Sequence, residues 1–142
     1  MNIRHPVVLI TGASRGIGAA IADALATHLR LVAAEQERRM AEVCDRTMVF
    51  IDEPLLGAVA PANGGDRRDW EWMIARLEEA LGGLKGLKGL RCGAGANLGL
   101  AMSTSADVVG FDAWSDDDLL APFVEDVKNF LRRGGTLAWG IV

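Results

Sequence analysis

A glycine-rich segment near the beginning of the chain has the residue types and spacing of a phosphate-binding loop. Its glycines, Gly12, Gly16 and Gly18, follow a short apolar run and open a helical pattern. Gly12 permits a tight turn, Gly16 lets a ligand approach the backbone, and Gly18 lets the helix pack closely on the strand. The helix N-terminus then offers free N–H groups and a partial positive charge to a phosphate. The segment therefore predicts a phosphate site made by Thr11, Gly12, Ser14, Arg15, Gly16, Ile17 and Gly18.

Four other residues with chemically useful side chains stand where apolar runs end: Asp52, Glu53, Cys92 and Asp112. The carboxyl ends of parallel strands share one edge of a sheet, and ligands bind there. We therefore treat these four residues as candidates for a substrate-binding rim. Carboxylates beside a phosphate loop repel a bare phosphate unless Mg²⁺ bridges them. The alternative is that Asp52 and Asp112 cap the turns or helices that follow them.

The sequence offers no complete catalytic or metal-binding set. His5 and His28 have no partner at a suggestive spacing, and Cys44 and Cys92 do not form a metal-type pair. The hydroxyl-bearing segment 103–105 has no His or Asp at a spacing typical of nucleophilic catalysis. We therefore predict no catalytic residues and no metal site.

The elements that would position these residues follow a regular alternation of strand and helix patterns. Predicted strands cover residues 7–10, 48–51, 86–92, 108–111 and 136–142. Predicted helices cover residues 17–43, 66–81, 97–102 and 117–132. Five strands with helical connections predict an α/β fold with a mostly parallel sheet, either an open Rossmann-like sheet or a partial (β/α) barrel.

Length and composition limit the remaining possibilities. The 142 residues fit one domain, and 50% of them are hydrophobic, which is enough for a core. A net charge of −4 without a basic face argues against nucleic acid as a partner. No signal peptide and no stretch of about 20 apolar residues is visible, so we expect a cytoplasmic protein without membrane contact. A partial barrel would expose an edge and an apolar face, which predicts a homo-oligomer, most simply a dimer.

Residues 7–26, which contain the glycine loop, resemble the cofactor loop of the short-chain dehydrogenase/reductase family. The resemblance implies a dinucleotide ligand, and Arg15 implies NADP(H) over NAD(H). This family uses a Tyr and a Lys four residues apart for catalysis, but the sequence contains no tyrosine. The family's cofactor selector after the second strand and its Asn-Ala-Gly segment are not matched either. The resemblance therefore implies a module that binds NADP(H) or another phosphorylated ligand, without reductase chemistry.

Residues 50–54, 105–112 and 133–142 resemble a different group, the superfamily of uroporphyrinogen decarboxylase and cobalamin-independent methionine synthase. In the methionine synthase branch, the acidic position matching Asp52 helps to hold an amino-acid substrate. Its zinc ligands are matched only by Cys92 and by Asp112 in place of a Glu, while Leu90 stands at the His position. Two ligands do not make a zinc site.

Together the two resemblances describe a composite or chimeric chain, with a nucleotide-fold-like unit in residues 1–26 and partial-barrel-like units in residues 27–142. Our leading interpretation is a domain of the decarboxylase/methionine synthase superfamily without a complete catalytic set, inactive as an isolated chain. The first alternative is a binding module for NADP(H) or a phosphorylated ligand. The second is a structural or engineered chain with no activity.

Overall fold

The strands of the chain form one parallel sheet. In the computed structural model, residues 16–53, 67–113 and 119–140 are described. Their four strands pair in the order β1-β2-β3-β4, and every pairing is parallel. The strands are β1 (Met48–Glu53), β2 (Leu87–Cys92), β3 (Val108–Asp112) and β4 (Thr136–Gly140). The predicted parallel α/β fold is thus confirmed with four strands rather than five, since predicted strand 7–10 lies outside the described residues.

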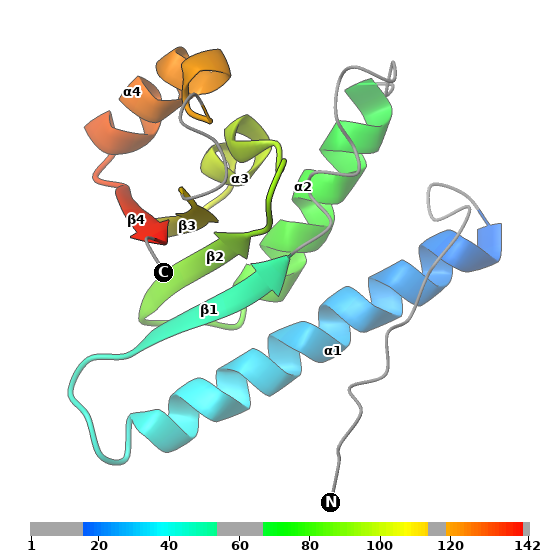
Figure 1. The fold of residues 1–142 in the computed structure, drawn as a ribbon. Helices are drawn as coiled ribbons and strands as arrows, with labels where there is room; N and C mark the ends of the chain where they lie inside the picture. The colour runs from blue at the N-terminus through cyan, green and yellow to red at the C-terminus, as the bar shows by residue number, and fades with distance from the viewer. Residues whose placement is uncertain (1–15, 54–66, 114–118, 141–142) are drawn as a thin grey trace, which may run out of the picture.

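Helices precede and connect these strands (Figure 1). They are α1 (Gly16–Met40), α2 (Arg67–Leu81), α3 (Leu98–Ser103), the 3₁₀ turn η3 (Ala121–Phe123) and α4 (Val124–Arg132). The last helix was predicted to begin at residue 117. Among the described residues its α-helical part begins only at Val124, after a 3₁₀ turn that contains Pro122. Proline lacks an N–H and clashes with the preceding turn, so it is tolerated only at a helix start.

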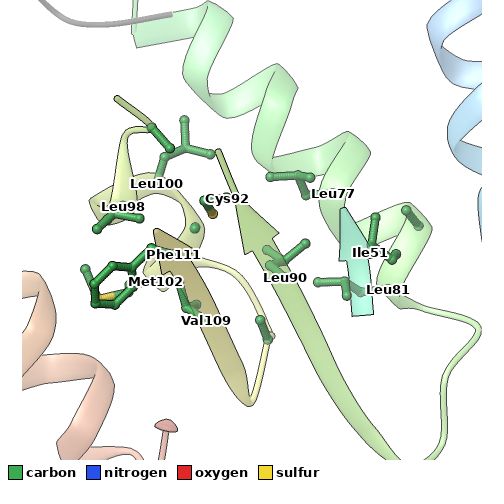
Figure 2. Packing of buried hydrophobic residues seen from close by; sticks show 14 of the residues in the cluster. Ile51, Leu77, Leu81, Leu90, Cys92, Leu98, Leu100, Met102, Val109 and Phe111 are labelled. Carbon is green, nitrogen blue, oxygen red and sulfur yellow. The ribbon is translucent and has the colours of Figure 1, made fainter. Parts of the chain in front are cut away.

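The core lies between the helices and one face of the sheet. Ile51, Leu90, Val109 and Leu137 stand in register across the four strands and point to this face. Figure 2 shows side chains of α2 and α3 packed near Ile51, Leu90 and Val109, and Leu137 packs against the same core cluster. The fully buried Phe130 closes the core from α4.

The opposite face of the sheet is not covered to the same degree. Met48 and Phe50 of β1 and Leu87 of β2 are 46%, 40% and 51% exposed. With right-handed crossovers, a sequential strand order places every connection on the same side of the sheet. In agreement, α1 contacts α2, α2 contacts α3, and α3 contacts α4. One wing of a doubly wound sheet and an arc of a barrel share this order, so the described strands fit both predicted architectures.

The amino ends of the strands are fastened by buried or half-buried charged side chains. Glu37 of α1 accepts hydrogen bonds from the backbone N–H groups of Lys85 and Gly86 and from the Thr47 hydroxyl. Burial opposes its ionisation, but these donors outweigh it and lower the pKa of Glu37, with the Lys85 N–H contributing most. The carboxylate therefore ties α1 to the turns that lead into β1 and β2.

Two further clamps hold the turn between α3 and β3. Glu78 of α2 accepts hydrogen bonds from the backbone N–H and the hydroxyl of Ser105. The Arg133 guanidinium donates to the carbonyl oxygens of Met102, Thr104 and Ala106. A cation at these carbonyls complements the negative end of the α3 dipole. These hydrogen bonds thus stabilise the turns that lead into the strands.

Candidate ligand site at the carboxyl ends of the strands

The carboxyl ends of the strands lie opposite the clamped end and bring predicted rim residues together. Asp52 and Glu53 end β1, Cys92 ends β2 and Asp112 ends β3. The register places Glu53 beside Cys92 and Asp112 beside Gly140. The loops that follow β1 and β3 lie outside the described residues. The prediction that these residues share one edge is therefore met by the sheet, whereas their role in binding a ligand stays a prediction.

Asp52 has a partner that the sequence analysis did not identify. Arg91 stands beside it in register, and its Nη1 atom donates to the Asp52 carboxylate over 3.2 Å. Both side chains are more than half exposed, so the pair contributes little to stability, typically about 0–1 kcal/mol. Its effect on the site is electrostatic, because Arg91 offsets one negative charge of the rim. Only the strand register, which periodicity does not give, could have revealed this pair.

Cys92 occupies a strand end, but its side chain belongs to the core. It is 2% exposed and packs near Leu77 and Leu98 (Figure 2). Burial raises the pKa of the Cys92 thiol to about 12, and the charges of Glu53 and Asp52 add to the effect. A neutral, buried thiol is neither a nucleophile nor a metal ligand. The assignment of Cys92 to the rim is therefore corrected. Its side chain lies in the core and does not line the rim.

This assignment predicts different reactivities for the two cysteines. Cys44 is exposed and Cys92 is buried. In the native protein at pH 8, we expect a thiol reagent such as Ellman's reagent to modify Cys44 and to spare Cys92. After unfolding in guanidinium chloride, both thiols should react. Rapid modification of two thiols in the native state would show that Cys92 is accessible and would contradict this assignment.

The loop after β2 contains a buried polar residue that the sequence analysis did not identify. Asn97 is 5% exposed, and its Oδ1 accepts the backbone N–H of Leu100, which caps the start of α3. Gly95, at φ 72°, supplies the left-handed conformation that turns this loop. Within the described ranges, no group of three or more His, Cys, Asp or Glu residues could hold a metal ion.

The glycine segment opens α1 as its phosphate-binding interpretation requires. Gly16, Ile17 and Gly18 form the first turn of this 25-residue helix, while residues 11–15 lie outside the described part. The first turn contains no acidic residue, and the last turn carries Arg38 and Arg39. Acidic side chains usually favour a helix N-terminus because of the helix dipole. Because the first turn of α1 has no acidic residue, no carboxylate of that turn offsets the partial positive charge at the N-terminus of α1.

A parallel α/β sheet with a glycine segment at the start of its first described helix is the arrangement that the open Rossmann-like prediction requires. Comparison with protein-family models gives a match to the family described as short chain dehydrogenase, over residues 6–122. This match covers most of the chain, and the chain belongs to that family. No curated protein and no solved structure matches the chain.

The family match also bears on the predicted composite chain. It extends from residue 6 to residue 122, and so includes the predicted boundary at residue 26. Neither a composite chain nor the resemblance to the decarboxylase/methionine synthase superfamily is supported by these comparisons. As for membranes, none of the helices in the described segments combines the length and the apolar character needed to span one.

Proposed function

We propose that the chain is a cofactor-binding module of the short-chain dehydrogenase family, which binds NADP(H) at its glycine loop. The observation that carries the proposal is the position of this segment at the N-terminus of α1, where the first turn holds no acidic residue. Free N–H groups and the helix dipole attract a phosphate there. The family match, which includes the whole loop, supports the proposal. Arg15 is the residue to which we assign the additional phosphate of NADP(H).

The proposed role is binding without the reductase reaction of the family. The resemblance assigns that reaction to a Tyr and a Lys four residues apart, and the sequence contains no tyrosine. These 142 residues therefore contain no phenol that could donate a proton to a substrate carbonyl. The strand ends of the described sheet carry an acidic rim, and Arg91 offsets the charge of Asp52 there. Such a rim suits the uncharged polar groups of a ligand, while its phosphate is assigned to the N-terminus of α1.

Ligand-induced stabilisation tests the proposal and the assignment of Arg15. A ligand that binds only the folded state at 100 times its Kd stabilises that state by about 2.7 kcal/mol. We expect NADPH to raise the melting temperature more than NADH does, because only NADPH carries the 2′-phosphate. In the Arg15→Ala variant, the advantage of NADPH should disappear while the NADH shift remains. Equal shifts for both nucleotides with the unaltered chain would contradict the assignment of Arg15.

A second candidate is compatible with the sequential strand order of the described strands, which a (β/α) barrel arc shares with one wing of a doubly wound sheet. In this case the chain would bind an amino acid at Asp52, as the resemblance to the methionine synthase branch implies. A melting-temperature increase with L-methionine, lost in Asp52→Asn, would support it. A shift with NADPH and none with L-methionine would exclude it.

A further inference from the structure

The helix α1 is attached unequally along its length to the rest of the described chain. At its C-terminal half, residues 30–40, a Cβ atom at Gly83 would lie 2.7 Å from the backbone oxygen of Arg30 and 3.2 Å from the Cβ of Ala34. Ala33 and Glu37 are buried in the same half. Ala33 is also the one α1 residue in the hydrophobic core cluster of the described ranges. The backbone of α1 is thus in close contact with the turn after α2.

Glu37 fixes the C-terminal half of α1 at one point. Its carboxylate accepts hydrogen bonds from the Thr47 hydroxyl before β1 and from the N–H groups of Lys85 and Gly86 before β2. A Cβ atom at Gly86 would lie 2.7 Å from Glu37 Oε1, so this turn fits closely around the carboxylate. Buried hydrogen bonds to a charged group are costly to break. We therefore expect this end of α1 to stay in place.

The N-terminal half of α1, residues 16–29, makes weaker contacts, and we call it the arm. Ala26 is the one buried residue among residues 20–29, and Ile21 and Leu25 are 43% and 37% exposed. In Figure 1, α1 passes close to the C-terminal end of α2, and the two helices diverge toward their N-terminal ends. Burial of apolar surface is the main force that holds packed helices together. The described side chains of the arm supply little of it.

Charged side chains bridge the arm to α2. Arg76 of α2 pairs with Asp23, and Glu79 of α2 pairs over 3.2 Å with Arg30, where the two halves of α1 meet. Ala26 lies on the same helix face, between Asp23 and Arg30. The four charged side chains are 30–52% exposed, so water and dissolved salt weaken both pairs. These bridges can therefore open and close without disturbing the core.

We propose that α1 pivots at Glu37, so that the arm moves toward and away from α2 while the C-terminal half stays in place. At a rise of 1.5 Å per residue, Gly16 lies about 30 Å from Glu37, and a rotation of about 10° moves it by about 5 Å. Gly16 and Gly18 lie in the first turn of this helix. The pivot therefore changes the separation between the glycine segment and the strand ends. If a ligand is held between them, a step that rests on the proposed function, α1 acts as its lid.

Thiol labelling of two matched positions tests the pivot. Ala26 and Ala33 are 5% and 6% exposed, so the static structure predicts equal reactivity for cysteines placed there. Each is replaced by cysteine in a Cys44→Ser chain, and the buried Cys92 serves as the internal reference. We expect Ala26→Cys to react with Ellman's reagent at least about tenfold faster than Ala33→Cys, because the opening that exposes position 26 leaves position 33 buried. Equal rates at the two positions would overturn the proposal.

The charged bridges are tested separately. Asp23→Asn and 1 M NaCl, in which the Debye length is about 3 Å, should each speed the labelling of Ala26→Cys and leave that of Ala33→Cys unchanged. The absence of both responses would contradict the proposal. Should Ala26→Cys lose circular dichroism signal, Thr27→Cys and Ala34→Cys form a second matched pair with the same expected difference, since both positions are half-buried.

NADPH relates the pivot to the proposed function. A nucleotide held at the N-terminus of α1 and at the strand-end rim fixes the arm, so saturating NADPH should slow the labelling of Ala26→Cys and not that of Ala33→Cys. The absence of calorimetric binding would contradict the proposed function, whereas the response to salt would still decide the pivot. Calorimetric binding without slower labelling would overturn the assignment of α1 as a lid.

Discussion

Replacement of Glu37 by alanine is expected to lower the free energy of unfolding by about 3–5 kcal/mol, the usual effect of breaking a buried charged network. Glu37 is 6% exposed, and its two oxygens accept from Gly86 N at 2.6 Å, Lys85 N at 2.8 Å and the Thr47 hydroxyl at 2.8 Å. Without the carboxylate, these donors lose their acceptor in a place with little access to water. Urea unfolding followed by circular dichroism measures the change.

Glu35 provides the matched control, since it lies on the same helix and also has a lowered pKa. Hydrogen bonds from Arg38 and Arg39 lower the pKa of Glu35 to about 2, but its side chain is 45% exposed. Solvent screens such surface pairs, and they contribute little to stability. We expect Glu35→Ala to unfold at nearly the same urea concentration as the unaltered chain. A loss similar to that of Glu37→Ala would show that burial is not what makes Glu37 important.

The pH dependence of stability follows from the direction of the Glu37 shift. Its pKa is lower in the folded state than its ordinary value of 4.5, so the folded state binds this proton less readily than the unfolded state. The stabilisation is fully present above pH 4.5 and is lost as the pH falls through the folded pKa. The stability difference between the unaltered chain and Glu37→Gln should therefore shrink in acid. A constant difference from pH 7 to pH 3 would contradict this account.

Replacement of Ala19 by glutamate is expected to weaken NADPH binding at least about tenfold, which is 1.4 kcal/mol. Position 19 lies in the first turn of α1, which has no acidic residue. A carboxylate there repels a phosphate at the helix N-terminus, while the helix itself gains about 0.3–1 kcal/mol from the dipole. Binding and stability should thus change in opposite directions. Calorimetric titration and thermal unfolding of the same sample measure both.

Ala19→Gln is the control for the size of the new side chain. It has nearly the same shape as glutamate but no charge, so the electrostatic account predicts affinity close to that of the unaltered chain. An equal loss of affinity in both variants would assign the effect to steric obstruction. Unchanged affinity in Ala19→Glu would place the phosphate elsewhere.

The parts of the fold that follow from side-chain periodicity were predictable from the sequence. β1, β2 and β3 lie where the apolar runs end in Asp52, Cys92 and Asp112, and α2 ends at Leu81 before two glycines. The strand-end rim followed because parallel strands share one edge. The start of α1 inside the glycine segment followed from the same reasoning.

The features that depend on contacts distant in sequence were not predictable. The Asp52–Arg91 pair requires the register of β1 against β2, and the Glu37 clamp joins a helix to a turn 48 residues away. Cys92 is predicted on the rim because it ends a strand, but the position alone does not show that its side chain points into the core. The resemblance to the decarboxylase/methionine synthase superfamily is not supported, whereas the family match agrees with the resemblance of the glycine loop.

Calorimetric titration of the unaltered chain with NADPH tests the central claim most directly. The proposed module predicts a saturable heat with one site per chain and a thermal shift that grows with ligand concentration. Absence of both heat and thermal shift at millimolar NADPH would contradict it, and the glycine segment would then be a strand-to-helix turn that binds no cofactor.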